Sequence, residues 1–192
     1  MATEHGSAKL SPELRQHAQR WDHLRDHLKR FRQITGEFPM LVDDPDGYES
    51  RRPNVIYHLG GPVYSQVYGN FGETTKYYTV EPELDESERD VFGDVKDKLL
   101  ERSVSKPAPT EDTDYEDRIQ ELLGEITVLE DERDGRLAEL VQRLELGPLQ
   151  VSEETYEKIR YRLVRDIVGL GPLEPIMRDP ANEDIHVIGP NQ

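Results

Sequence analysis

The spacing of the apolar residues changes twice along this chain, and that change limits the folds it can adopt. Between residues 12 and 33 apolar side chains recur at helical spacing, which predicts a helix. Between residues 54 and 80 they alternate with polar ones, which predicts strands. Helical spacing then returns. The pattern predicts an α+β fold with an N-terminal helical section, a β-hairpin, a long acidic helical arm and the start of a small α/β domain.

Residues 1–36 are predicted to form a basic amphipathic helix. Ser11 is a suitable N-cap, and Pro12 suits the first helical position. The apolar stripe consists of Leu14, Ala18, Trp21, Leu24, Leu28 and Phe31. The cations that make the segment basic are Arg20, Arg25, Lys29, Arg30 and Arg32. This basic side could bind an acidic partner or an anionic surface, or it could pack against the acidic remainder of the chain.

Two histidines of this helix, His23 and His27, are one turn apart and could together bind a metal. They lie off the apolar stripe, and the sequence offers no obvious third ligand. Surface histidines are therefore the simpler interpretation.

Residues 37–84 are predicted to be a turn-rich segment followed by the β-hairpin. The carboxylates of the Asp43–Gly47 stretch miss the spacing of an EF-hand calcium loop, so a solvated turn is the better interpretation. Tyrosines are frequent in the predicted strands and could either stack nucleic-acid bases or pack across the strands. They are Tyr57, Tyr64, Tyr68, Tyr77 and Tyr78. The negative charge of the chain favours packing.

The remainder is predicted to be mainly helical. A helix over residues 85–102 begins with capping-box spacing at Asp85 and Glu88. Residues 103–112, with two prolines, form a predicted linker. Residues 113–147 form the acidic helical arm. In the last block, residues 148–192, Ser152 caps a helix that Gly169 and Gly171 end, and Ile185–Ile188 resembles a strand. Because the chain ends just where a hairpin should turn back, we expect it to be a fragment.

Charge and composition exclude several classes of function. The chain has 40 acidic and 24 basic residues, for a formal net charge of −16. This charge disfavours nonspecific nucleic-acid binding. An acid-rich, lysine-poor surface is typical of organisms with a salt-loaded cytoplasm, although an ordinary acidic protein with a disordered segment would also explain it. The absence of cysteine excludes disulfides, cysteine-ligated metals and a thiol nucleophile. Without a membrane-spanning run or a signal-peptide core, we expect a cytoplasmic protein.

Sequence motifs for catalysis are absent from this chain. It has no Gly-x-x-x-x-Gly-Lys-Ser/Thr phosphate loop, no Gly-x-Gly-x-x-Gly, no His-Glu-x-x-His and no Gly-x-Ser-x-Gly. Glu183 and Asp184 are a carboxylate pair that could serve acid–base chemistry. Neighbours on a strand point to opposite faces, so a capping or salt-bridge role is the simpler interpretation.

One stretch, residues 161–187, resembles a known family. Arg165-Asp166 closes the predicted helix, Gly169-Leu170-Gly171 follows, and Asp179-Pro180 and Glu183-Asp184-Ile185 come next. This order resembles the N-terminal-domain signature of type II/type IV secretion ATPases. Residues 78–84 are similar to the archaeal branch, and with the acidic composition the resemblance extends to haloarchaeal members. The chain departs at Leu170, where the family often has an aromatic residue, and residues 113–134 look like a branch-specific insertion.

The resemblance implies a part of a larger motor. Family members are hexameric cytoplasmic ATPases, docked under a polytopic membrane platform, that power type IV pilus, archaellum or secretion-system assembly. Their phosphate loop lies in a C-terminal RecA-like domain, which this chain lacks. We therefore expect no cofactor or metal in the chain itself, which would be inactive alone, although the whole protein would use ATP and magnesium.

The resemblance also implies roles for individual residues. Arg165 matches a family position that can approach the nucleotide, and Arg160 and Arg162 are its neighbours; guanidinium groups suit phosphate oxygens. The alternative is a salt bridge from Arg165 to one of three acids, namely Asp166, Asp179 or Glu183. The other motif residues are expected to be structural; they are Asp166, Gly169, Gly171, Asp179, Glu183 and Asp184. Another function remains open: a stand-alone acidic interaction module, or a split-gene relic, that binds a motor or platform protein.

Overall fold

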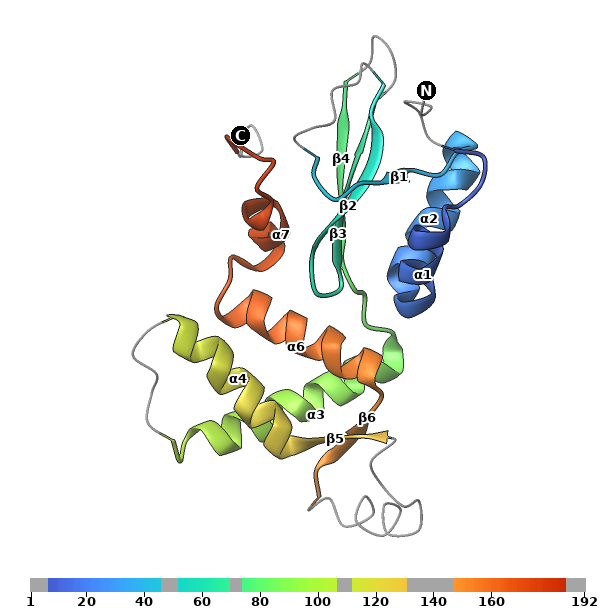
Figure 1. Cartoon of the computed structure of the whole chain (residues 1–192). Helices are drawn as coiled ribbons and strands as arrows, with labels where there is room; N and C mark the ends of the chain where they lie inside the picture. The colour runs from blue at the N-terminus through green and yellow to red at the C-terminus, as the bar shows by residue number, and fades with distance from the viewer. Residues whose placement is uncertain (1–6, 46–51, 70–73, 107–111, 131–146, 186–192) are drawn as a thin grey trace, which may run out of the picture. The chain divides into compact units, whose positions relative to one another are not determined.

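The computed structural model describes residues 7–45, 52–69, 74–106, 112–130 and 147–185. The chain divides into two compact units. The sheet unit comprises residues 1–82 and 172–192, and the helical unit comprises residues 83–171. Helices and strands occur together, so the predicted α+β class is confirmed (Figure 1). None of the described helices is long and apolar enough to cross a membrane.

Four strands in the order β1-β2-β3-β4 form the sheet of the sheet unit. They are β1 (Met40–Leu41), β2 (Asn54–Gly60), β3 (Val63–Tyr68) and β4 (Lys76–Val80). β1 is parallel to β2, whereas β2–β3 and β3–β4 are antiparallel. Gly60 and Gly61 have φ angles of 115° and 54°, which glycine adopts without strain, and they turn β2 into β3. The predicted strands are therefore confirmed, and the two-residue strand β1 is an addition.

Helices α1 (Pro12–Arg20) and α2 (Asp22–Thr35) cover one face of this sheet (Figure 1). The expectation of one continuous helix is wrong, because Trp21 between them has extended backbone (φ −122°, ψ 110°). No proline or glycine causes the break. The Trp21 side chain is only 5% exposed and belongs to the core between helices and sheet, so tertiary packing decides it. Ser11 caps α1 as expected, with its side chain accepting from the Leu14 N–H.

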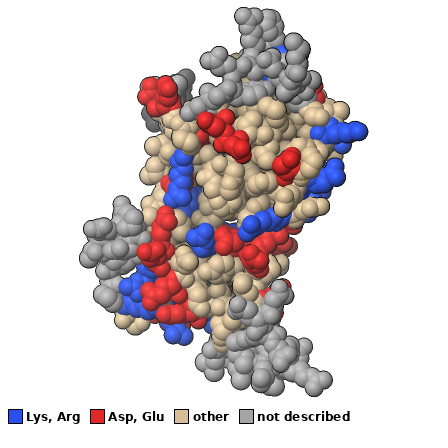
Figure 2. Space-filling model, in the orientation of Figure 1, with Lys and Arg blue, Asp and Glu red and all other residues tan. Residues whose placement is uncertain are grey.

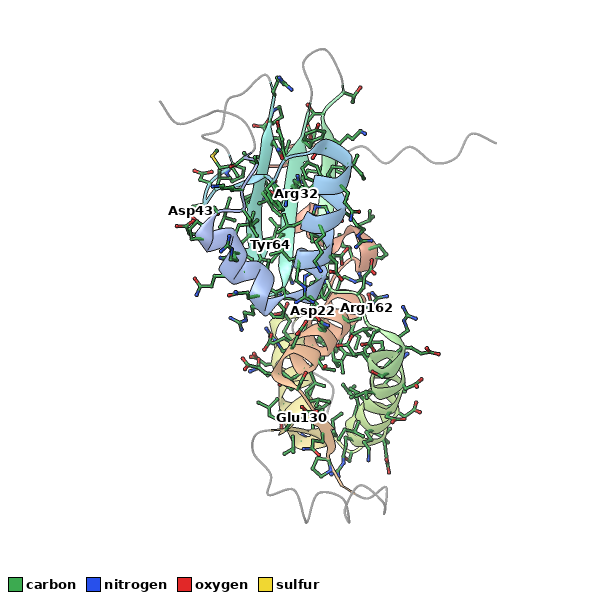
Figure 3. The ribbon with its side chains drawn as sticks, turned by 90° about the vertical axis from the view of Figure 1, so that its right-hand side faces the viewer. Asp22, Arg32, Asp43, Tyr64, Glu130 and Arg162 are labelled. Carbon is green, nitrogen blue, oxygen red and sulfur yellow. The ribbon has the colours of Figure 1, made fainter. Side chains whose placement is uncertain are left out.

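The basic side of α1 and α2 is neutralised in part by its own helix. Arg25 pairs with Asp22 at 2.5 Å, and Lys29 pairs with Asp26 at 3.1 Å. Arg32 lies over the ring of Phe38, with Cζ 4.9 Å from the ring centroid (Figure 3). The cations of this segment therefore have local partners within the sheet unit.

The described residues of the helical unit form three long helices and a small parallel β-pair. They are α3 (Glu86–Ser103), α4 (Asp112–Ile126), β5 (Thr127–Leu129), β6 (Leu149–Val151) and α6 (Glu153–Ile167). Apolar side chains from all three helices form its core; the fully or nearly buried ones are Leu84, Val95, Leu99, Ile119, Leu122, Leu123, Ile126, Ile159 and Leu163. The predicted capping box is present, since Asp85 accepts from the Glu88 N–H and the Glu88 side chain accepts from the Asp85 N–H.

The acidic arm predicted over residues 113–147 is not one helix. α4 ends at Ile126, and the chain continues as β5, which pairs with β6. Thr127 and Val128 are β-branched residues that suit a strand, and the Thr127 hydroxyl bonds to the Leu123 carbonyl oxygen at 2.6 Å. The second half of the predicted arm, residues 131–146, lies outside the described residues, as do residues 107–111 of the predicted linker.

The last predicted block, residues 148–192, is not one module. Its first part, through α6, belongs to the helical unit, whereas residues from Pro172 onward belong to the sheet unit. The second part contains the end of a short 3₁₀ helix, η2 (Gly171–Leu173), and helix α7 (Glu174–Arg178). The physical reason is a set of hydrogen bonds, described below, that join Asp179 to the sheet. Most of the predicted strand Ile185–Ile188 lies outside the described residues.

Candidate functional site

Helix α6 carries the arginines for which a nucleotide role is predicted. Ser152 caps its first turn by accepting from the Thr155 N–H at 3.0 Å, and Ile159 and Leu163 bury its inner face. Arg160 and Arg162 are two residues apart, so they lie on nearly opposite sides of the helix. The three arginines therefore do not converge on one point: Arg160 pairs with Glu157 at 3.4 Å, away from the other two.

Arg162, which Figure 3 labels, and Arg165 share one carboxylate, Asp166, at the C-terminal end of α6. The Arg162 Nε is 3.1 Å from Oδ2 of Asp166, and the Arg165 Nη2 is 2.8 Å from Oδ1. The Arg165 side chain is only 7% exposed, whereas Arg162 and Asp166 are about two-fifths exposed. Asp166 is one of the three acids considered for a salt bridge to Arg165, and the two residues form that bridge. The oxygens of a phosphate accept hydrogen bonds from a guanidinium in the same way as the oxygens of this carboxylate.

A buried ion pair next to this site was missed by sequence reasoning. Lys158 of α6 lies 3.0 Å from Glu88 of α3, and both residues are less than a tenth exposed. Lys158 also pairs with Glu154 at 3.1 Å, and the Thr155 hydroxyl donates to Glu88. Burial opposes the charge of Lys158, but the hydrogen bonds to the two carboxylates outweigh it and raise its pKa. Glu88 thus links the N-terminal cap of α3 to the first half of α6. In the sequence, the capping-box spacing pointed to Glu88, but it did not indicate Lys158 as its partner.

The two glycines after α6 shape the exit of the chain. The Gly169 N–H donates to the Val164 carbonyl at 3.0 Å and so closes the last turn of the helix. Gly171 has a φ of 60°, a left-handed conformation that other residues rarely adopt. Gly171 therefore has a backbone geometry that a glycine accommodates without strain.

Asp179, expected to be structural, is the most buried acid of the motif. It is 2% exposed and lies against the sheet of the sheet unit. The Tyr57 hydroxyl donates to Asp179 Oδ2 at 2.5 Å, and the Tyr77 hydroxyl donates to the same oxygen. Ser65 in turn lies 2.6 Å from the Tyr77 hydroxyl. The other oxygen, Oδ1, accepts from the Ala181 N–H at 2.9 Å.

The two phenols are strongly perturbed by this arrangement. Burial raises the pKa of Tyr57, and its hydrogen bond to Asp179 raises it further. Burial and the bond to Asp179 likewise raise the pKa of Tyr77 to about 12. Both phenols therefore stay protonated and act as donors throughout the physiological range. The tyrosines were expected to pack across strands, and no pattern in the sequence pointed to a carboxylate partner more than 100 residues away.

The remaining predicted site residues do not gather around these groups. Glu183 and Asp184 are exposed at the end of the described residues. The same described residues contain no group of three histidine, aspartate or glutamate side chains that could hold a metal ion.

The expectation that His23 and His27 are surface residues is wrong. His23 is 8% exposed, and its Nε2 is 2.7 Å from the Pro62 carbonyl oxygen. His27 is half-buried, and its Nε2 is 2.6 Å from Gln66 Oε1. Both imidazoles face the sheet and help dock α2 on it, because the sheet offers polar acceptors at these points.

Comparison with known proteins gives one sequence relative to report. No protein-family profile matches the chain. The chain is 32% identical over 182 residues to the uncharacterized protein MJ0900 of the archaeon Methanocaldococcus jannaschii. The match covers 93% of this chain and 33% of that protein, so the chain spans about a third of the length of this relative.

Proposed function

We propose that this chain is the N-terminal, regulatory and docking part of an ATPase that powers type IV pilus, archaellum or type II/IV secretion assembly. The observation that carries the proposal is the motif of residues 161–187, in which two acids, Asp166 and Asp179, have defined partners. Asp166 holds Arg162 and Arg165, and Asp179 holds Tyr57 and Tyr77. Gly171, between them, adopts the left-handed backbone that its position demands.

The length of the archaeal relative supports the same proposal. Two thirds of that protein lie outside the match, which leaves room for a further domain. This chain contains no phosphate loop in its sequence. In the proposed protein, ATP and magnesium would bind in a RecA-like domain outside this chain, six copies would assemble, and the ring would sit under a membrane platform at the cytoplasmic side.

Within that proposal Arg165 is the residue that approaches the nucleotide. The Arg165 guanidinium donates to Asp166. A phosphate oxygen would take the place of the carboxylate as the acceptor of one of these hydrogen bonds. Arg162, on the other oxygen of Asp166, keeps that carboxylate in place. Arg160 pairs with Glu157 on the far side of the helix and is not expected to take part.

The test compares nucleotide binding and ATP turnover by this chain and by a longer protein that contains it, in molar KCl. We expect neither activity in the chain alone and both in the longer protein. Arg165→Ala should lower nucleotide affinity or turnover about tenfold, the size of one charge-assisted hydrogen bond. Arg160→Ala is the matched control and should change neither.

Three results would count against the proposal. Turnover by the chain alone would reveal a phosphate site that the sequence does not show, and the family resemblance would have to be abandoned. Equal activity of the Arg165→Ala and Arg160→Ala proteins would remove the nucleotide role of Arg165. A longer protein without ATPase activity, together with tight binding of this chain to a platform protein, would favour a stand-alone interaction module.

A further inference from the structure

Three histidines of the α1–α2 helix pair are hydrogen-bonded to alternate positions of the β2–β3 hairpin. His17 Nδ1 lies 2.6 Å from the Tyr64 hydroxyl, His23 Nε2 lies 2.7 Å from the Pro62 carbonyl oxygen, and His27 Nε2 lies 2.6 Å from Gln66 Oε1. Positions 64 and 66 are two residues apart on β3 and so face the same side of the sheet. The helix pair is thus fastened to the sheet by imidazoles at three points along its length.

A fourth histidine comes from the sheet itself. The ring of His58, on β2, lies 4.9 Å from the ring of Tyr64 and 6.1 Å from the ring of His17, between centroids. The groups that face His17 are therefore Arg20 from its own helix, His58 from β2 and the neutral phenol of Tyr64 from β3. Burial lowers the pKa of His17, and the charges of His58 and Arg20 lower it further.

His27 lies in a second polar chain that crosses the same interface. Gln66, its partner, donates to Asn54 Oδ1 at 3.3 Å, and both residues are at most 3% exposed. The ring of His27 also packs against Phe31 of α2 and Tyr78 of β4. The charged group that faces it is Arg30 from α2. Burial lowers the pKa of His27, the bond to Gln66 opposes that effect, and Arg30 adds to it.

We infer that His17 and His27 form an acid-sensitive latch, which holds the α1–α2 helix pair on the sheet while the rings are neutral and releases it when they are protonated. The reason is electrostatic. A proton on either ring places a positive charge in a partly or largely buried position beside another cation, Arg20 or Arg30. Once the helices leave the sheet, water solvates both charges and the repulsion falls.

The sign of the pH response follows from linkage. Because the folded chain lowers the pKa of both histidines, the unfolded or undocked state binds more protons below the ordinary histidine pKa of about 6.5. Docking is therefore fully stable above that pH and weakens as the pH falls. Release would uncover the apolar stripe of the helices, which includes Leu14, Leu24 and Leu28.

The chain carries its own reporter for this event. Trp21 is the single tryptophan of the sequence, and it lies 5% exposed between α1 and α2. The experiment follows Trp21 emission of the full chain from pH 8 to pH 5, with backbone hydrogen exchange of β3 measured in parallel, because β3 is paired with β2 and β4 in the same unit. We expect a reversible red shift of the emission below about pH 6.5 while β3 stays protected.

The variants decide whether the histidines cause the shift. The double substitution His17→Gln and His27→Gln keeps hydrogen-bonding side chains but removes the titration, and it should move the transition to lower pH by about half a unit or more. His186→Gln is the control and should leave the transition in place. If the double variant does not fold, the NMR titrations of His17 and His27 in the unaltered chain provide the second measurement: both should titrate below the ordinary value and in step with Trp21.

Each contrary result would overturn the inference. Trp21 emission that stays constant to pH 5 would show that no release occurs. A transition unchanged in the double variant would assign it to other groups. Simultaneous loss of β3 protection would mean acid unfolding of the whole sheet unit instead of a latch, and histidines that titrate normally would leave the latch without a cause.

Discussion

The two faces of the β2–β3–β4 sheet are built from alternate residues of the same strands, yet they hold their partners by different chemistry. One face presents Ile56, Tyr64 and Val80 to the helices α1 and α2, whose imidazoles are hydrogen-bonded to it. The other presents Tyr57, Ser65 and Tyr77 to the single carboxylate of Asp179. The comparison shows how strand periodicity can give one small sheet an apolar, histidine-fastened side and a hydroxyl-lined side.

The two faces also respond to pH in opposite directions. Lowered histidine pKa values make the helix side sensitive to acid, whereas raised tyrosine pKa values make the Asp179 side sensitive to alkali. Near neutral pH both sides are in their most stable protonation states. This contrast leads to four predictions, from the largest expected effect to the smallest.

The largest effect is expected from a cavity on the helix side. Leu24 is completely buried among the helices and the sheet, so Leu24→Ala should lower the free energy of unfolding by about 3 kcal/mol. Chemical denaturation followed by Trp21 emission measures it. Leu100→Ala, at an exposed helical position, is the control and should cost less than about 0.5 kcal/mol. Similar losses for both would show that Leu24 is not a core residue.

On the opposite face, Asp179→Asn should lower the free energy of unfolding by about 2 kcal/mol. The change keeps the volume but leaves the two tyrosine hydroxyls with a weaker, neutral acceptor in a buried site. Asp184→Asn, the same change at an exposed position of the same unit, should have little effect. Equal denaturation midpoints for the two variants would contradict the proposed anchoring of the C-terminal segment.

The loss of folding stability at alkaline pH should depend on Tyr77. Because its folded pKa, about 12, exceeds the unfolded value of about 10, its contribution is complete below pH 10 and disappears as the pH rises through 12. Tyr77→Phe should therefore flatten the loss of stability between pH 10 and 12. Unfolding by denaturant at a series of pH values tests this, with the neighbouring Tyr78→Phe as control. An unchanged slope in the Tyr77 variant would exclude the assignment.

The smallest effect is expected on the pH at which acid changes the Trp21 emission. The positive charge of His58 helps to lower the pKa of His17, so His58→Gln should raise that pKa and move the Trp21 transition to lower pH by a few tenths of a unit. Paired emission titrations of the two proteins measure the difference. A shift toward higher pH would mean that His58 stabilises docking through its ring contact with Tyr64 and not through charge.

The candidate site on α6 was partly predictable. Arg165 and Asp166 are neighbours, so their pairing follows from local sequence, and the separation of Arg160 from Arg162 follows from helical geometry. The Lys158–Glu88 pair was not predictable in the same way, because its members are far apart in the chain. Only the packing of α3 against α6 brings them together.

The sequence alone determined the features that depend on local spacing and local caps. The strands between residues 54 and 80, the caps at Ser11, Asp85 and Ser152, and the α+β class all follow from periodicity and short-range hydrogen bonds. Tertiary structure decided the break at Trp21, the pairing of β5 with β6, the docking of His17, His23 and His27, and the burial of Asp179. These depend on contacts between residues far apart in the chain, which form only when whole elements pack, and no local pattern specifies the partner.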